Sequence, residues 1–346
     1  MDHDVVIGID PHKNSWFAAV VDARHQLLGQ LRGSANRAGY RELQRLARRW
    51  PNIHWAIEGC NGLGRPLTQR LIADQITPVD VPSKLSSRIR QLTTGHGRKT
   101  DQVDAYSVAV AALTGADRPH HQDEQAETLR LLSEHRDELV RRRTQVINRL
   151  HVLLSQLLDG GAPASLTADQ AARLLGRIRR PQGTQATRRS LAADLVAEIR
   201  HLDKKITAAE KQISDALSES ETSLLQLPGC GPILTARIIG RVGSLARFPN
   251  ADHFASYCGT APLEVSSGDV TRHRLSRAGD RQLNHALHLI ALSQIRFHSP
   301  ARAYYHRKRA AGKGHREAMR CLKRRLATVI YRHLAADQPP DTHPTA

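Results

Sequence analysis

The stretch VVIGID, residues Val5–Asp10, decides the fold of the first part of the chain, because it is typical of a buried strand that ends in a carboxylate. A second apolar run, Ile53–Ile57 (IHWAI), is followed directly by another acid, Glu58. A third stretch, KTDQVDA at residues 99–105, holds two aspartates three positions apart. Three separate stretches of the chain therefore supply the same type of charge beside apolar elements.

The order of the apolar runs around these acids predicts an α/β domain. The first three strands are joined by short turns, and the later strands alternate with helices. The predicted strands are Val5–Asp10, Trp16–Val21, Leu27–Leu31, Ile53–Ile57 and Thr77–Val81, and the predicted helices cover about residues 37–48 and 63–73. A three-stranded meander followed by alternating helix and strand is the order of the ribonuclease H-like fold. That fold places carboxylates on its first strand, at the end of its fourth strand and on a late helix, where these acids fall.

Asp101 and Asp104 share one face of a predicted helix over residues 100–113, with Cβ atoms roughly 5–6 Å apart. Two like charges this close repel each other unless a cation lies between them. A hard cation is held by a few carboxylates, and two such ions about 4 Å apart clamp a phosphodiester. With Asp10 and Glu58, these acids predict a Mg²⁺ (or Mn²⁺) site. The structural alternative is that Asp10 begins a turn with Pro11 and that the other two aspartates favour a helix N-terminus.

The composition indicates a polyanionic partner. The chain of 346 residues has 51 Lys+Arg against 33 Asp+Glu, a net charge of +18, so counterion release favours binding to nucleic acid. No apolar run approaches the ~20 residues of a membrane-spanning helix, and no signal peptide opens the chain, so we expect a soluble, cytoplasmic protein without a membrane partner. The spacing of the four cysteines predicts neither a disulfide framework nor a zinc site; they are Cys60, Cys230, Cys258 and Cys321.

The middle of the chain is predicted to form two long helices, over residues 125–158 and 195–216. The second has apolar positions in steps of four and three, as a coiled-coil seam requires: Leu195, Ile199, Leu202, Ile206, Ala209, Ile213 and Ala216. A linker is expected at about residues 159–190, with one short helix around Ala171–Arg177. The seam closes either within one chain, as an antiparallel hairpin, or between two chains.

The C-terminal part is expected to be mostly α-helical and to contact phosphates. The segment LQLPGCGPIL, residues 225–234, is typical of the hairpin of a helix-hairpin-helix motif, whose backbone N–H groups at Gly229 and Gly231 would face a phosphate. An ordinary turn between helices is the alternative. Residues 296–332 hold 12 Lys+Arg and a single acid, which favours a phosphate-tracking surface. Further candidate nucleic-acid contacts are Arg272, Arg274, Arg277 and Arg281.

These motifs together resemble the DEDD-type insertion-sequence transposases, relatives of the pilin-gene invertase, over nearly the whole chain. The stretches that carry the resemblance are Gly8–Asp10, Glu58–Gly59, Lys99–Ala105, Leu227–Gly231 and Gly259–Pro262 followed by Ser267–Gly268. The resemblance implies a RuvC-like DEDD domain over residues 1–120, a helical coiled-coil region over 121–220 and a transposase domain over 221–335. Residues 336–346 are expected to form a disordered tail.

The resemblance also implies a mechanism. Asp10, Glu58, Asp101 and Asp104 would bind the metal, and Ser267 would attack a DNA phosphodiester to form a covalent phosphoserine. The implied partners are double-stranded donor and target DNA, a structured bridge RNA that guides target choice, and further copies of the chain, as dimers that assemble into a tetramer. The neighbouring Ser266 leaves the identity of the nucleophile open.

Two other functions compete with an RNA-guided recombinase. A metal-dependent, structure-selective nuclease of the Holliday-junction resolvase kind would use the same four acids with water as the nucleophile. A basic nucleic-acid scaffold with a degenerate site would use none of them. The recombinase and the nuclease differ in whether they need Ser267.

Overall fold

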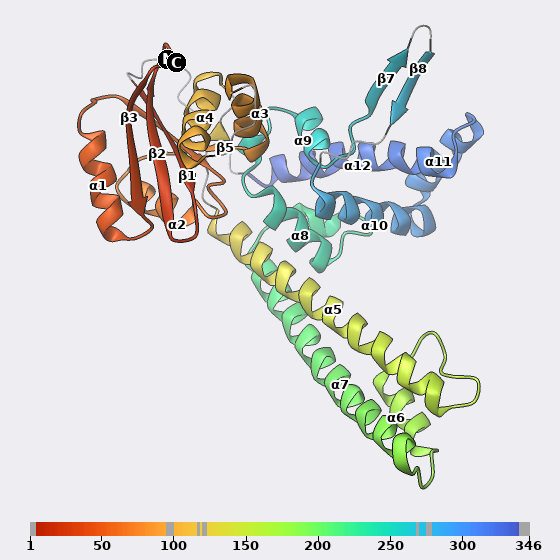
Figure 1. The fold of residues 1–346 in the computed structure, drawn as a ribbon. Helices are drawn as coiled ribbons and strands as arrows, with labels where there is room; N and C mark the ends of the chain where they lie inside the picture. Colours follow the sequence, from red (N-terminus) through yellow and green to blue (C-terminus); the bar gives the residue numbers. More distant parts are fainter. Residues whose placement is uncertain are drawn as a thin grey trace. The chain divides into compact units, whose positions relative to one another are not determined.

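A computed structural model of the chain describes residues 5–94, 100–115, 118–119, 123–267, 270–274 and 279–338. The chain forms two compact units, Met1–Gln122 (unit 1) and Asp123–Ala346 (unit 2). Figure 1 shows the elements of both units, coloured along the sequence.

Unit 1 contains a mixed six-stranded sheet with the order β3-β2-β1-β4-β5-β6. The first three strands form an antiparallel meander, β4 and β5 run parallel to β1, and β6 is antiparallel to β5. The strands are β1 (Val5–Pro11), β2 (Ser15–Asp22), β3 (Leu27–Ser34), β4 (Ile53–Glu58), β5 (Val79–Val81) and β6 (Arg118–Pro119). This is the strand order of the ribonuclease H-like fold that the sequence predicts.

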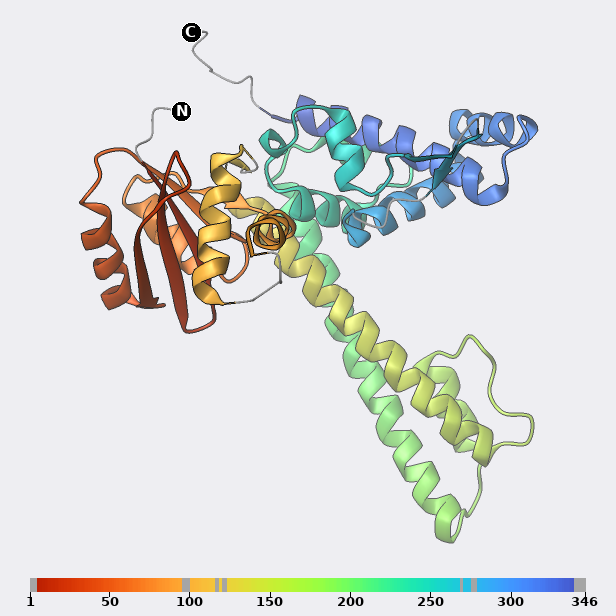
Figure 2. The ribbon, with the colours of Figure 1, turned by 45° about the horizontal axis from the view of Figure 1, so that its top comes forward.

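Helices cover both faces of the sheet, as Figures 1 and 2 show. On one face, α1 (Arg37–Ala47) and α2 (Arg65–Ala73) bury their apolar sides against Ile7 and Ile9 of β1. On the other face, α4 (Asp101–Leu113) packs against Val6. The sequence analysis did not predict α3 (Ser83–Thr94), which packs on α4. The alternation of side chains along β1 therefore sends Val6, Gly8 and Asp10 toward α4.

Unit 2 begins with two long helices, α5 (Glu124–Leu157) and α7 (Gly183–Ser218), which lie side by side in Figures 1 and 2. A short helix, α6 (Ala168–Gly176), lies between them in sequence. The apolar seam predicted on the second helix is buried from Leu195 to Ile213, against α5 of the same chain. The predicted linker over residues 159–190 is too long, because α7 already begins at Gly183. Its first turns are polar and carry no apolar repeat that the sequence analysis could detect.

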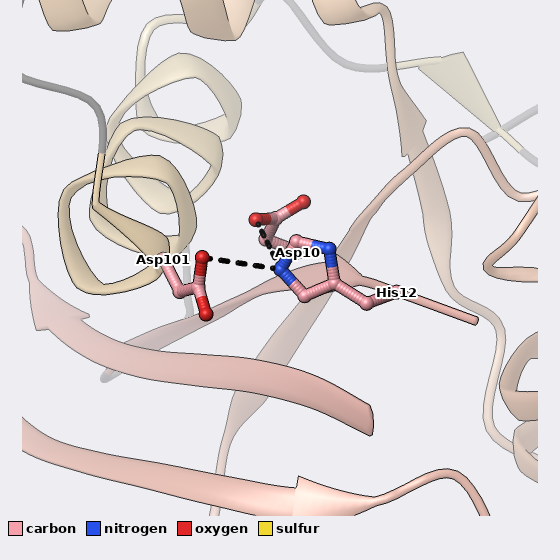
Figure 3. Close-up of side chains that lie close together, drawn as sticks. All are labelled: Asp10, His12 and Asp101. Atoms are coloured by element: carbon pink, nitrogen blue, oxygen red, sulfur yellow. Dashed lines mark ion pairs between the residues drawn. The ribbon is translucent and has the colours of Figure 1, made fainter. Parts of the chain in front are cut away.

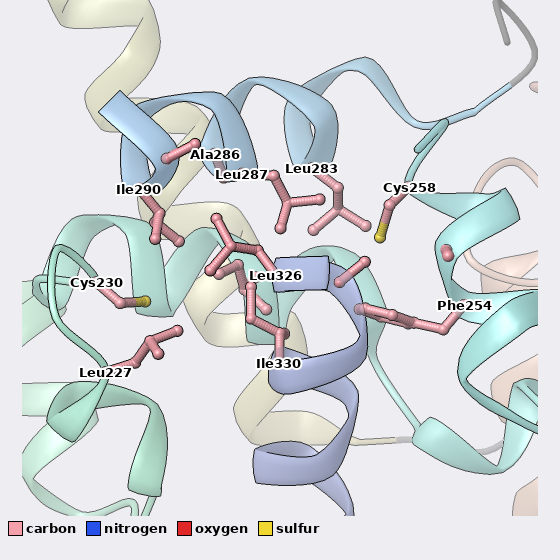
Figure 4. Close-up of a cluster of buried hydrophobic side chains, with 14 of the residues drawn as sticks. Leu227, Cys230, Phe254, Cys258, Leu283, Ala286, Leu287, Ile290, Leu326 and Ile330 are labelled. Atoms are coloured by element: carbon pink, nitrogen blue, oxygen red, sulfur yellow. The ribbon is translucent and has the colours of Figure 1, made fainter. Parts of the chain in front are cut away.

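The rest of unit 2 is a helical layer around one core, drawn in Figure 4. Phe254 and Ile290 are fully buried there, and Cys230 and Cys258 lie in the same core. The elements are the 3-10 turns η1 (Ser223–Gln226) and η2 (Leu245–Arg247) and the helices α8 (Pro232–Val242), α9 (Ala251–Tyr257), α10 (Arg281–Phe297), α11 (Ser299–Ala310) and α12 (His315–Ala336). Gly240 of α8 allows close packing on α5, since a Cβ there would meet the backbone N of Arg130 at 2.5 Å.

A β-hairpin in unit 2 was not predicted within the C-terminal part, which was expected to be mostly α-helical. β7 (Leu263–Ser267) pairs antiparallel with β8 (Val270–Arg274). The two strands are short and largely polar, so neither has the apolar alternation that predicts a strand. At the other end, Asp337 falls in the predicted disordered tail but accepts hydrogen bonds from Thr222 and the backbone N–H of Ser223. Residues 339–346 of that tail lie outside the described residues.

The four cysteines are free thiols, three of them buried, as the absence of a disulfide spacing predicts. Among the helices in the described part of the chain, none combines the length and the apolar character needed to cross a membrane.

Candidate functional site

The close packing of α4 on β1 brings the acids of unit 1 together. A Cβ on Gly8 would lie 2.3 Å from the backbone N of Ala109 and 2.4 Å from the carbonyl oxygen of Ala105. Only glycine therefore lets the helix lie directly on the strand. The Thr100 hydroxyl caps the helix by accepting a hydrogen bond from the backbone N–H of Val103, so α4 begins at Asp101, beside the end of β1.

Among the described residues, Asp10, His12 and Asp101 form a group of possible metal ligands, drawn in Figure 3. The Nε2 atom of His12 lies 3.3 Å from a carboxylate oxygen of Asp10 and 3.4 Å from one of Asp101. One ligand atom from each residue lies within 4.8 Å of the others. Asp10 is largely buried, with 13% of its side chain exposed, whereas Asp101 is 48% exposed. The group therefore lies at the surface end of the strand, open to a substrate.

Glu58 and Asp104 lie in the same electrostatic neighbourhood. In the parallel ladder Ile9 pairs with Ile57, so Asp10 and Glu58 follow at the same level on adjacent strands. A Glu58 oxygen accepts a hydrogen bond of 2.8 Å from the hydroxyl of Ser86 on α3. Asp104 is buried and forms an ion pair with Arg90, also on α3. The charges of the other three predicted acids are thus close enough to act on Asp10.

The neighbouring acids affect the pKa of Asp10. Burial is the largest cause that raises its pKa, to about 6; the nearby His12 opposes the rise, and the charges of Glu58, Asp104 and Asp101 add to it. A carboxyl group that is hard to ionise beside other acids indicates a site whose negative charge is not balanced from within. A divalent cation would supply the missing charge.

The donor set fits a divalent cation. Carboxylate oxygens from Asp10 and Asp101 and the imidazole nitrogen of His12 converge, and Glu58 lies at the same level of the sheet. Within the part of the chain that the structure describes, the buried Nε2 atom of His12 has no hydrogen-bond partner, so it is available to bind a ligand. Asp104 would need to leave Arg90 to join them. Metal binding through Asp10, Asp101 and His12 therefore requires little rearrangement, and binding through Asp104 requires more.

Sequence reasoning missed three residues of this site. His12 lies two positions after Asp10, and its place next to a candidate ligand on an extended segment was the only available signal. Ser86 and Arg90 lie on α3, which the apolar pattern did not predict, so no signal pointed to them. The partners of Glu58 and Asp104 became visible only in the folded unit.

The candidate nucleophile lies on the hairpin of unit 2. The backbone of Ser267 ends β7 and pairs with Val270, while Ser266 pairs with Thr271. The adjacent Gly268 lies outside the described residues.

The base of this hairpin is held tightly. A Cβ on Gly279 would lie 2.2 Å from the backbone N of Gly259. The backbone segments before and after the hairpin are therefore in contact at these two glycines. The side-chain amide of Asn284 donates to the carbonyl oxygens of Cys258 (2.9 Å) and Gly259 (3.1 Å). The backbone N–H of Asp280 donates to the carbonyl of Tyr257 at 2.7 Å. These contacts hold together the two chain segments that flank the hairpin.

The predicted nucleic-acid contacts of unit 2 fall in different places. Gly229 has a φ of +83°, and a Cβ there would meet the Cβ of Ser293 at 2.9 Å, so packing against α10 accounts for this glycine. Gly231 is the N-cap of α8 and has open space at its Cβ position. Arg272 and Arg274 are in β8, Arg281 begins α10, and Arg277 lies outside the described residues.

Arg281 borders a groove with a volume of about 640 Å³ between α5, the start of α8 and α10. The groove is lined by apolar and basic side chains. Arg237 and Arg136 in this lining are neutralised by Asp137 and Glu210. Within the described residues, no carboxylate pairs with the other two arginines of the lining, Arg141 and Arg281. The groove therefore keeps positive charge available for an external anion.

Comparison with known proteins places these sites in a family. Residues 7–158 match the DEDD_Tnp_IS110 family, described as "Transposase", and residues 221–306 match the "Transposase IS116/IS110/IS902 family". The chain is 28% identical to the insertion element IS116 44.8 kDa protein of Streptomyces clavuligerus, an alignment that covers 98% of each chain. It is 28% identical to the mini-circle putative transposase for IS117 of Streptomyces coelicolor, over 96% of this chain and 94% of that one.

A relative of a different kind is the pilin gene-inverting protein of Moraxella bovis, 28% identical over 41% of this chain and 47% of that one. Among solved structures, Thermus thermophilus RuvC in complex with a Holliday junction substrate aligns with 15% identity and a TM-score of 0.27. That alignment covers 34% of this chain and all of RuvC. The first match covers the acidic group of unit 1 and continues through α5 of unit 2, and the second match covers the serine hairpin. The chain belongs to the DEDD-type insertion-sequence transposases of the IS110/IS116 family and is a DNA transposase.

Proposed function

We propose that this transposase cuts and rejoins DNA with Ser267 as the nucleophile, assisted by a divalent cation held by Asp10, Glu58, Asp101 and Asp104. The observation that carries the proposal is the grouping of these acids. Three separate segments of unit 1 bring carboxylates to one end of the sheet, where burial and the charges of the other three acids raise the pKa of Asp10.

The bound cation would stabilise negative charge on the phosphate that is attacked and on the leaving oxygen. The residues of the chain do the rest. Asp10 and Glu58 project from adjacent strands of a rigid sheet, which fixes the separation of their carboxylates. The packing of α4 on Gly8 sets the position of Asp101 relative to them. This rigidity favours catalysis, because the site is organised before substrate binds.

In the proposed reaction the Ser267 oxygen loses its proton and forms a bond to phosphorus, and the bond between phosphorus and one DNA strand breaks. The departing strand takes a proton on its new hydroxyl. In the second step a hydroxyl of another strand attacks the phosphoserine, and Ser267 recovers its proton. The number of phosphoester bonds is the same before and after, so strand exchange needs no nucleotide cofactor.

The groove between α5, α8 and α10 is the proposed contact surface for nucleic acid in unit 2. Arg141 and Arg281 line this groove, and their guanidinium groups can donate hydrogen bonds to phosphate oxygens. The proposed partners are donor and target DNA and a structured guide RNA that selects the target by base pairing. Exchange between two duplexes requires more than one nucleophile, and for this reason the proposed active form is a homo-oligomer, a dimer or a tetramer.

The decisive experiment compares Ser267→Ala with Ser266→Ala in a strand-exchange assay using the full chain. We expect Ser267→Ala to lose exchange and to keep RNA binding, while Ser266→Ala keeps most of both. A nicked DNA substrate should trap a covalent adduct that mass spectrometry maps to Ser267. Exchange at the wild-type rate by Ser267→Ala would instead favour a metal-dependent nuclease that uses water.

The groove is tested separately by Arg141→Glu and Arg281→Glu, with Arg200→Glu on the exposed face of α7 as the matched control. Each groove variant should weaken nucleic-acid binding and lower the slope of log affinity against log salt by about one. Equal losses in the control would show that net charge alone, and not the groove, governs binding.

A further inference from the structure

His12 occupies an unusual position between two acids. It follows β1 at the end that carries Asp10, and its Nε2 atom lies between the carboxylates of Asp10 and Asp101. This atom is buried, although 39% of the side chain is exposed. It lies within ion-pair range of both carboxylates and is hydrogen-bonded to neither. The ring therefore points at the space between the two oxygens.

An imidazolium that served only to neutralise the acids would point its N–H at one oxygen. Charge-assisted hydrogen bonds of this kind are about 2.7–2.9 Å long and nearly linear. The distances of 3.3 Å and 3.4 Å are longer and almost equal. Ligands at adjacent corners of an octahedron with bonds of about 2.1 Å lie about 3 Å apart. The arrangement of the three atoms is closer to a shared ligand position than to a hydrogen bond.

We propose that His12 is a ligand of the divalent cation and that its nitrogen makes the site prefer Mn²⁺ to Mg²⁺. This inference rests on the proposed metal site and adds a fifth residue, of a different chemical type, to the four acids. It concerns the composition of the site and the choice of ion, and it is independent of which serine is the nucleophile.

The preference for the ion follows from ligand chemistry. Mg²⁺ takes oxygen ligands and gives up its water reluctantly, whereas transition-metal ions accept imidazole nitrogen. Mn²⁺ takes carboxylate oxygen as Mg²⁺ does and, as a transition-metal ion, also accepts imidazole nitrogen, so of these two ions it fits Asp10, Asp101 and His12 better. A site with acids alone would discriminate much less between Mg²⁺ and Mn²⁺.

The test uses Mn²⁺ as a paramagnetic probe bound to the full chain. In the wild type, pulsed electron paramagnetic resonance should detect a nitrogen bonded directly to Mn²⁺. In His12→Asn this coupling should disappear, with Mn²⁺ affinity lower by about ten-fold and Mg²⁺ affinity changed by less than about three-fold. The matched control is His25→Asn in the exposed β2–β3 turn, where asparagine tolerates the φ of +63°. This variant should behave as the wild type.

The outcomes separate this inference from the function on which it rests. Mn²⁺ bound without nitrogen coupling in the wild type, or coupling that persists in His12→Asn, would overturn the role of His12 and leave a site made of acids. Unchanged Mn²⁺ binding in Asp10→Asn would overturn the metal site itself.

Discussion

The carboxylates of the two units have different partners. In unit 2, Asp137 accepts two hydrogen bonds, of 2.6 Å and 2.7 Å, from the buried guanidinium of Arg237. Asp280 pairs with Arg241 at 2.6 Å and also caps α10. In unit 1, Asp10 is similarly buried but has no Arg or Lys in ion-pair contact among the described residues, and its neighbours are acids and His12.

This difference distinguishes acids that stabilise the fold through ion pairs from acids that lack a cationic partner and are available to a metal ligand. The charge of a buried carboxylate is balanced when a guanidinium pairs with it, and removing either partner leaves an uncompensated charge. A buried carboxylate among other acids is held at a cost to stability, and an external cation relieves that cost. Asp104 lies between the two classes, because Arg90 neutralises it without a metal. Two optical signals can measure the stability of the two units separately and so distinguish these two classes of acid.

The three tryptophans, Trp16, Trp50 and Trp55, all lie in unit 1, so their fluorescence follows the unfolding of that unit. Far-UV circular dichroism follows mainly the long helices of unit 2.

The largest effect is expected from Asp137→Ala. This change leaves the guanidinium of Arg237, 7% exposed, without its partner and should lower the stability of unit 2 by about 3 kcal/mol. Urea unfolding measured by circular dichroism should show the loss, while the tryptophan transition stays in place. The double variant Asp137→Leu with Arg237→Met is the control and should recover most of the stability. If the tryptophan transition alone showed a loss of stability, Asp137 would not be an acid that stabilises unit 2.

Asp10→Asn should have the opposite effect on unit 1. The change removes a buried charge and its repulsion from Glu58, Asp101 and Asp104, so without metal we expect a gain of about 1–2 kcal/mol at pH 8. DNA strand exchange should be lost in the same variant. Tryptophan fluorescence during urea unfolding, with a chelator present, measures the stability. A large loss of stability would place Asp10 with the structural acids.

The stability of unit 1 should depend on pH because Asp10 ionises. Asp10 has a pKa of about 6 in the folded chain and about 3.9 when unfolded, so the folded state binds the proton more tightly. Its contribution to stability is therefore full below pH 4 and is lost as the pH rises through 6. Unfolding by urea in chelator should show a decline of about 1–2 kcal/mol across this range in the wild type. Asp10→Asn should lack this decline; an equal decline in both proteins would assign it to other groups.

The smallest effect is expected from Arg200→Ala. The ion pair of Arg200 with Asp169 is on the surface, with side chains 51% and 73% exposed, so water and salt screen it. Circular dichroism should detect a change below about 0.5 kcal/mol. A loss as large as that of Asp137→Ala would mean that burial does not decide which ion pairs matter.

Much of unit 1 could be predicted from its sequence because its strands are regular. The apolar runs at Val5–Ile9 and Ile53–Ile57 predicted strands with acids at their ends, and the structure has β1 and β4 there. The helix predicted over residues 100–113 is α4. The hairpin β7–β8 could not be predicted, because its short polar strands are defined by cross-strand hydrogen bonds and not by an apolar face.

The site followed a similar division. The four acids could be chosen from sequence because each stands next to an apolar element. His12, Ser86 and Arg90 could not, because a polar residue becomes part of a site only through its neighbours in space. The nucleic-acid role of Gly229 stays a prediction, and its positive φ and its packing against Ser293 require a glycine there in any case.

By itself, the sequence determined which segments become strands and helices and which acids end them, since periodicity and local charge are properties of the chain. Only the tertiary structure decided the partner of each acid. Gly8 lets α4 lie on β1, and this contact sets Asp101 beside Asp10 and His12, while α3 gives Asp104 its arginine. The physical reason is that charges interact over a few ångströms, and such distances between remote segments exist only after packing.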